Sequence, residues 1–231
     1  MPHGPAILIA LIGLVLAFVI TMSIRSAHRR RAGIKSFATT HGLIHEKKAE
    51  AEFRHAWAVV PELPDRGSIY NLMYGQDGET EYTYFEHTQV VMVGSTPSSI
   101  VHTVGSSATD PDSPDMHVLR RNLLKSLLSK AGSLPEVTID DGTFSRRWIV
   151  RCEDPAFATR LLSPPVRAMI DEERKTRGWH IMGGRCIIVC VYSMRAARLE
   201  ALRTRLMAFA DAVQHSLDVV LVPRDEELHD G

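Results

Sequence analysis

An uncharged apolar stretch near the start of the chain has the length of a membrane span. Residues Ala6 to Ile24 are nineteen residues without a charged side chain. A helix of that length covers about 28 Å, and the hydrocarbon core of a bilayer is about 30 Å thick. A cleaved signal peptide fits poorly, because no basic residue precedes the stretch and no small-residue cleavage site follows it. The pattern therefore predicts an uncleaved transmembrane anchor over residues 1–24.

A cluster of basic residues follows the apolar stretch at once, whereas the five residues before Ala6 contain no Lys or Arg. Cytoplasmic flanks of membrane spans carry the excess of Lys and Arg. We therefore predict a single-pass protein of the cell (inner) membrane with its N-terminus outside and its soluble part in the cytoplasm. The cluster could alternatively bind anionic lipid headgroups, but we favour the interpretation that it only sets the topology. Its members are Arg25, Arg29, Arg30, Arg31 and Lys35.

Helical spacing continues beyond the basic cluster. Ile34, Phe37 and Ala38 lie three and four residues apart, which predicts a helix over 26–41 that ends at Gly42. The basic juxtamembrane segment then covers 25–45. His41 and His45 have the spacing of two metal ligands on a helix, but Gly42 separates them and no third ligand is evident, so we expect solvated histidines.

Alternating positions in the next part of the chain predict a β-hairpin. Residues 68–74 and 79–87 alternate around the turn sequence at 75–78, and residues 88–93 extend the second strand. Residues 46–66 are expected to be irregular, and 94–114 to be mostly loop with a short strand at 100–104. Tyr70, Leu72 and Tyr74 are expected to share one face of the first strand, and Tyr82 and Tyr84 one face of the second, so that aromatic pairs across the strands stabilise the sheet.

Helical and alternating patterns follow one another in the second half. Leu119, Leu123, Leu127 and Leu128 predict a helix over 116–130, ended by Gly132. Short strands are expected at 137–139 and 144–152, around a turn at 140–142. The later elements are a helix from Pro155 capped by Asp154, a helix over 166–175, a hairpin of 179–182 with 186–192, and a long amphipathic helix over 195–217.

This order of elements predicts an α+β fold with a largely antiparallel sheet. The soluble domain is expected over residues 46–222, either as one unit or as two halves of about 46–132 and 133–222. An acidic tail, 223–231, is expected to fray.

Composition narrows the functional classes. The chain has 27 Lys and Arg against 27 Asp and Glu, a balance that argues against nucleic acid as a partner. Three cysteines, Cys152, Cys186 and Cys190, lie in apolar stretches, which fits reduced thiols in a cytoplasmic core better than a zinc site. The acidic pairs at 140–141 and 153–154 fit a turn and a helix cap. No nucleotide-binding or nucleophile motif occurs, so we predict no catalytic residue, no cofactor and no metal.

The overall plan resembles a group of uncharacterised bacterial single-span membrane-anchored proteins with a cytoplasmic α+β domain. The resemblance rests on the span, the basic helix that ends at His41-Gly42, and the stretch Phe144 to Ile170. It implies no activity.

The leading hypothesis is a membrane-tethered module that interacts with the lipid bilayer and with a protein or lipid partner. The alternative is an enzyme or small-ligand domain with an unrecognised pocket. A deep pocket with converging polar residues favours the enzyme or ligand domain, and a shallow surface with an apolar or basic patch favours the interaction module.

Overall fold

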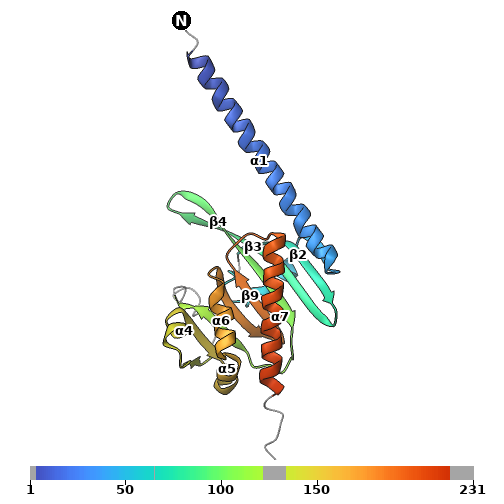
Figure 1. Ribbon diagram of the computed structural model, residues 1–231, viewed down its shortest axis with the longest axis vertical. Coiled ribbons are helices and arrows are strands. Elements are labelled where there is room, and N and C mark those ends of the chain that lie inside the picture. The colour runs from blue at the N-terminus through green and yellow to red at the C-terminus, as the bar shows by residue number, and fades with distance from the viewer. Residues whose placement is uncertain (1–3, 65, 122–133, 219–231) are drawn as a thin grey trace, which may run out of the picture.

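The longest element is helix α1, Gly4–Thr40, which runs without a break from the apolar stretch into the domain. The computed structural model describes residues 4–64, 66–121 and 134–218. Side chains at Ile34, Phe37 and Ala38 are buried, as their spacing predicted, whereas the large apolar side chains from Leu11 to Ile24 are exposed. Within the described residues, this helix is long and apolar enough to cross a membrane, consistent with an anchor. It projects far from the domain (Figure 1).

One antiparallel sheet forms the centre of the domain. Among the described residues it has nine strands in the order β1-β2-β3-β4-β9-β8-β5-β7-β6, and every pairing between them is antiparallel. The predicted α+β class with an antiparallel sheet is confirmed. The strands are β1 Ile44–Lys48, β2 Ser68–Asp77, β3 Thr80–Val93, β4 Thr96–Ala108, β5 Met116–Arg120, β6 Glu136–Val137, β7 Trp148–Cys152, β8 Thr176–Met182 and β9 Arg185–Cys190.

Helices cover both faces of the sheet. Helix α7 packs on β4 and β9 and is itself contacted by α1, α5 and α6 (Figure 1). The short α2 and the segment after it cover part of the opposite face. In the described part of the chain, the helices besides α1 are α2 Ala51–Trp57, α4 Gly142–Arg147, α5 Pro155–Leu161, α6 Pro164–Glu172 and α7 Ala196–Asp218.

Strand alternation divides the buried side chains into two cores, because successive side chains of a strand point to opposite faces. On β3, Tyr82 and Tyr84 belong to the large core under α7, whereas Phe85 belongs to the smaller core under α2. On β9, Ile188 belongs to the large core and Ile187 to the smaller one. The tyrosine rings stack with centroids 6.1 Å apart, which confirms that Tyr82 and Tyr84 share a face.

Several predicted elements are confirmed. The two hairpins exist as β2–β3 and β8–β9. Helix α5 begins at Pro155 with the Asp154 carboxylate accepting hydrogen bonds from the Ala156 and Phe157 backbone amides. The predicted amphipathic helix is α7, with one apolar side buried and Leu217 packed against the core at its end; the buried residues of that side are Leu199, Leu202, Leu206, Phe209 and Val213. The acidic tail lies outside the described residues.

Regions predicted as irregular contain regular structure. Residues 94–114 were expected to be mostly loop, yet β4 occupies Thr96–Ala108 between β3 and β9, so the short strand predicted at 100–104 is the middle of a much longer one. Its Ser and Thr residues indicated a loop, but Ser106 and Ser107 are buried in the sheet, so strand pairing overrides their turn preference. In the segment 46–66, β1 begins before it and α2 forms within it, ending ahead of Pro61.

The predicted helix over 116–130 is wrong at its start. Met116–Arg120 is strand β5, which lies between β7 and β8 with Val118 opposite both Val150 and Trp179. A strand covered on both faces reads as a continuous apolar run, so its period does not distinguish it from a helix. The leucines at 123, 127 and 128, which gave the helical pattern, lie outside the described residues.

The predicted strand 144–152 begins later than expected. Residues Gly142–Arg147 form α4, because the Asp141 carboxylate caps the helix by accepting hydrogen bonds from the Thr143 and Phe144 amides. The strand starts at Trp148.

A β-bulge corrects the predicted face of Tyr70. Asn71 has φ of 50°, and the register shifts between Tyr70 and Met73. An extra residue in one strand reverses the alternation beyond it. Tyr70 therefore lies opposite Glu86, on the face away from Tyr74, while Leu72 and Tyr74 share the face under α2.

Candidate functional site

The predicted basic cluster lies on α1 where the helix meets the domain. Arg25 and Arg29 line a groove of about 430 Å³ together with Arg30 and with Arg195, which precedes α7. Arg25, Arg29 and Arg195 are exposed and have no ion-pair partner among the described residues. The fold thus brings one cation from a distant part of the chain to the cluster. Arg31 and Lys35 are also exposed but do not line the groove.

Arg30 has a structural contact that the other basic residues lack. Its guanidinium donates to both oxygens of Glu86, at 2.5 and 2.6 Å, and to the Met194 carbonyl at 2.9 Å. The Glu86 carboxylate is almost fully buried and also accepts from the Asn71 amide and from the Met194 backbone N–H. This ion pair joins α1 to β3 and to the start of α7.

The histidines and cysteines considered in the sequence lie in environments that serve the fold. The His41 ring lies between two carboxylates, 3.1 Å from Asp77 and 3.1 Å from Glu200, while His45 is on β1. All three cysteines are free and buried in the large core. Burial raises the pKa of the Cys152 thiol to about 11 and that of Cys186 to about 12, so the thiols stay protonated and behave as small apolar side chains.

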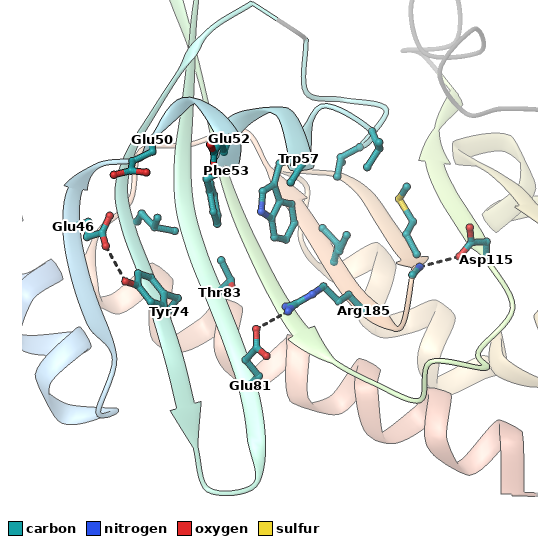
Figure 2. Close-up of a pocket in the computed structure, with 17 residues that line it drawn as sticks. Glu46, Glu50, Glu52, Phe53, Trp57, Tyr74, Glu81, Thr83, Asp115 and Arg185 are labelled. Carbon is teal, nitrogen blue, oxygen red and sulfur yellow. Dashed lines mark hydrogen bonds and ion pairs between the residues drawn. The ribbon is translucent and has the colours of Figure 1, made fainter.

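A cleft of about 940 Å³ lies between α2 and the sheet. Helix α2 carries Phe53 and Trp57 four residues apart, so both project from one side of the helix. Figure 2 shows both rings directed from α2 toward the strands. The strands supply further apolar side chains to the same space, namely Leu72 from β2, Met182 from β8 and Ile187 from β9. The cleft therefore has an apolar interior.

Carboxylates surround this interior. Glu46, Glu50 and Glu52 gather at one end, where β1 leads into α2, while Glu81 and Asp115 lie on the far side (Figure 2). The one cation of the described lining is Arg185, whose guanidinium pairs with Glu81 at 2.5 Å. The cleft entrance thus carries an excess of negative charge.

Two hydrogen bonds fix parts of this rim. The Tyr74 hydroxyl donates to Glu46 at 2.8 Å, and that bond, with burial and the neighbouring negative charge, raises the pKa of Tyr74. The Gly183 amide donates to Asp115 at 3.1 Å. Among the described residues, no group of three or more His, Cys, Asp or Glu side chains is arranged to hold a metal ion. The rim carboxylates are instead spread around the opening, and those of Glu50 and Glu52 make no hydrogen bond or ion pair with other described residues.

Sequence reasoning missed this cleft. Its lining comes from β1, α2, β2, β3, β8 and β9 and from the segment before β5, so no short motif marks it. One local signal was present: Phe53 and Trp57 are two large apolar residues at helical spacing within an otherwise polar and acidic segment.

The comparisons with known proteins reach only the fold. No protein-family model matches the chain, and no curated protein matches its sequence. A solved structure is similar: the crystal structure of the mycobacterial trehalose monomycolate transport factor A, TtfA. The TM-score is 0.56 at 15% identity, and the match covers 85% of this chain and 97% of that chain. The two proteins therefore share a fold over nearly the whole neighbour.

Proposed function

We propose that the chain is a membrane-tethered lipid-interaction module of the inner membrane, with its domain in the cytoplasm. Its cleft under α2 binds the acyl chain of a lipid that has an uncharged, hydroxyl-rich headgroup. The observation that carries this proposal is the combination of an aromatic and aliphatic interior with a carboxylate rim.

The chemistry of the rim selects the headgroup. Carboxylates accept hydrogen bonds from hydroxyl groups, as sugars offer them, whereas they repel a phosphate placed at the same opening. The neighbour TtfA is a transport factor for trehalose monomycolate, an ester of a sugar with a long-chain fatty acid. That lipid has the two properties that the cleft favours. The polar groups lie around the rim and do not converge at one point (Figure 2), which supports binding more than catalysis.

Binding of a trehalose fatty-acyl monoester to the full chain in nanodiscs tests the proposal, with partition into empty nanodiscs subtracted. Ala56 is exposed on α2 and lines the cleft, so Ala56→Trp fills the cleft without disturbing a core. Ala208, exposed on α7 across the sheet, gives the matched control Ala208→Trp. We expect affinity at least tenfold weaker for Ala56→Trp and unchanged for Ala208→Trp.

The headgroup is tested with the same acyl chain on phosphatidate, which should bind at least tenfold more weakly than the trehalose ester. Glu50→Gln/Glu52→Gln should reduce that difference, because it removes two rim charges. Equal binding of the ester by both tryptophan variants contradicts a lipid site in the cleft. Binding of a basic, apolar peptide in place of either lipid would indicate a protein partner instead.

A further inference from the structure

The β3–β4 hairpin extends well beyond the sheet that supports its base. Strand β2 reaches β3 only as far as Thr88, and β9 reaches β4 only as far as Thr103. From Gln89 to Ile100 the two strands pair with each other and with no other described strand. Figure 1 shows this ribbon projecting from the domain. An isolated two-stranded ribbon is marginally stable in water, so it benefits from a surface that covers it.

The tip of the ribbon is uncharged, with apolar residues on its β3 side at 90–93 and small Ser, Thr and Pro residues opposite them at 96–99. Residues 88–101 contain no Asp, Glu, Lys or Arg. Val90, Met92 and Val93 are 66%, 65% and 66% exposed, and the turn between the strands is Gly94-Ser95. Protruding strands usually carry charges that keep them soluble. Their absence here indicates that the tip meets an apolar environment.

Contacts with α1 show which way the hairpin points. Asp77, at the end of β2, lies beside His41; farther along, Tyr84 packs on Phe37; and Glu86 binds Arg30. Residue numbers rise along β3 while they fall along α1. The strand therefore runs toward the apolar stretch, and the ribbon beyond Glu86 lies on the same side of the domain as α1 (Figure 1).

The reach of the ribbon is sufficient to meet the bilayer. From Glu86 to Val93 a strand extends about 23 Å. From Arg30 back to Ile24, where the apolar stretch ends, α1 rises about 9 Å. The tip therefore reaches the level of Ile24 even when the hairpin is strongly inclined to α1. Arg25 and Arg29 lie at this same end of the domain, where they suit lipid phosphates.

We infer that the tip of the β3–β4 hairpin, residues 88–101, inserts into the headgroup and upper acyl region of the leaflet from which α1 emerges. The domain then has two attachments to one bilayer, α1 and the hairpin tip. These hold it in a fixed orientation at the surface. The inference does not depend on what the cleft binds.

Fluorescence of the full chain in proteoliposomes of phosphatidylcholine and phosphatidylglycerol tests this inference. Met92→Cys places an environment-sensitive nitrobenzoxadiazole label at the tip. Glu79→Cys places it at the exposed β2–β3 turn, at the other end of β3. The native cysteines are buried, so the labelled wild-type chain gives the blank. Nitroxide-bearing lipid and aqueous iodide serve as the two quenchers.

We expect the tip label to shift its emission to the blue and to be quenched by nitroxide lipid several-fold more than the turn label, with the opposite order for iodide. Adding Val93→Asp to the tip-labelled chain should reduce the lipid quenching toward the turn value while the circular dichroism spectrum stays unchanged. Equal iodide quenching at both positions, with no lipid quenching, would overturn the inference. Shielding of the tip label from both quenchers would also overturn it, since it would place a protein, such as a second copy, on the hairpin.

Discussion

Single buried histidines make the stability of the domain dependent on pH. His102, on β4, is buried near His87, Glu62 and Arg177, and burial lowers its pKa to about 4. His117, bonded to His180 at 3.0 Å, has its pKa lowered to about 3 for the same reason. The unfolded chain binds a proton on each ring below about pH 6.5, whereas the folded chain does not. The contribution of these two rings to the free energy of unfolding is therefore full above that pH and decreases as the pH falls toward 4.

His102→Gln should flatten this dependence, because it removes a group that only the unfolded chain protonates. We expect the slope of the unfolding free energy between pH 6 and 4.5 to decrease by up to about 1.4 kcal/mol per pH unit. Urea unfolding of the chain in detergent, followed at several pH values, measures it. His55 is exposed, so His55→Gln is the control. Identical slopes for the two variants would show that His102 does not contribute.

The junction of α1 with the domain depends on one arginine of the basic cluster. Removing Arg30 leaves the buried Glu86 carboxylate without its cation, and breaking a buried ion pair from one side costs several kcal/mol. Because the Arg30 side chain is 37% exposed, we expect a smaller loss, about 2 kcal/mol, for Arg30→Gln. The neighbouring Arg29→Gln should cost under about 0.5 kcal/mol.

Thermal unfolding of both variants in the same detergent measures the difference. Limited proteolysis between α1 and β1 gives a second readout, since α1 should detach more often in Arg30→Gln. Equal stability and equal cleavage of the two variants would mean that the Arg30–Glu86 pair does not hold α1 to the domain.

Elements with a clear period could be predicted from the sequence, and elements set by their neighbours could not. The stripe Leu199 to Val213 has one period along the whole helix, so α7 was predicted nearly to its ends. Strand β5 was misread because burial on both faces removes the alternation that marks a strand. Strand β4, Thr96–Ala108, was predicted only over 100–104, because its buried serines prefer turns until β3 and β9 pair with them.

The candidate site was harder to predict than the fold, for a related reason. The basic cluster is continuous on α1, so Arg25 and Arg29 were evident, but Arg195 joins them only through tertiary packing. The cleft combines Trp57 with residues as distant in sequence as Ile187. Such a site depends on which strands lie next to each other in the sheet. The order of strands in the sheet could not be predicted from the sequence, so the site could not be predicted either.

At the scale of the whole molecule, the charges that the fold leaves free beside the apolar stretch predict how the chain is oriented in the membrane. Arg25, Arg29 and Arg31 are exposed beside the apolar stretch, and Arg30 is the member used by the fold. The positive-inside rule counts Lys and Arg close to the end of a span, and these three arginines lie there. The three free, buried thiols agree with a reducing compartment for the domain. We therefore predict that alkaline phosphatase fused to the C-terminus of the chain is inactive in bacteria, whereas a fused fluorescent protein matures.

Neutralising the three free arginines should weaken this orientation. In Arg25→Gln/Arg29→Gln/Arg31→Gln we expect part of the population to invert, seen as new phosphatase activity, because the flank keeps few cations near the span. Lys47, Lys48 and Arg66 are exposed but lie beyond the roughly 20 residues over which such charges act. Their triple Gln variant removes the same charge and should leave the fusion inactive. Strong phosphatase activity of the unaltered fusion would place the domain outside the cytoplasm, and the carboxylate-rimmed cleft would then face lipids of the outer leaflet.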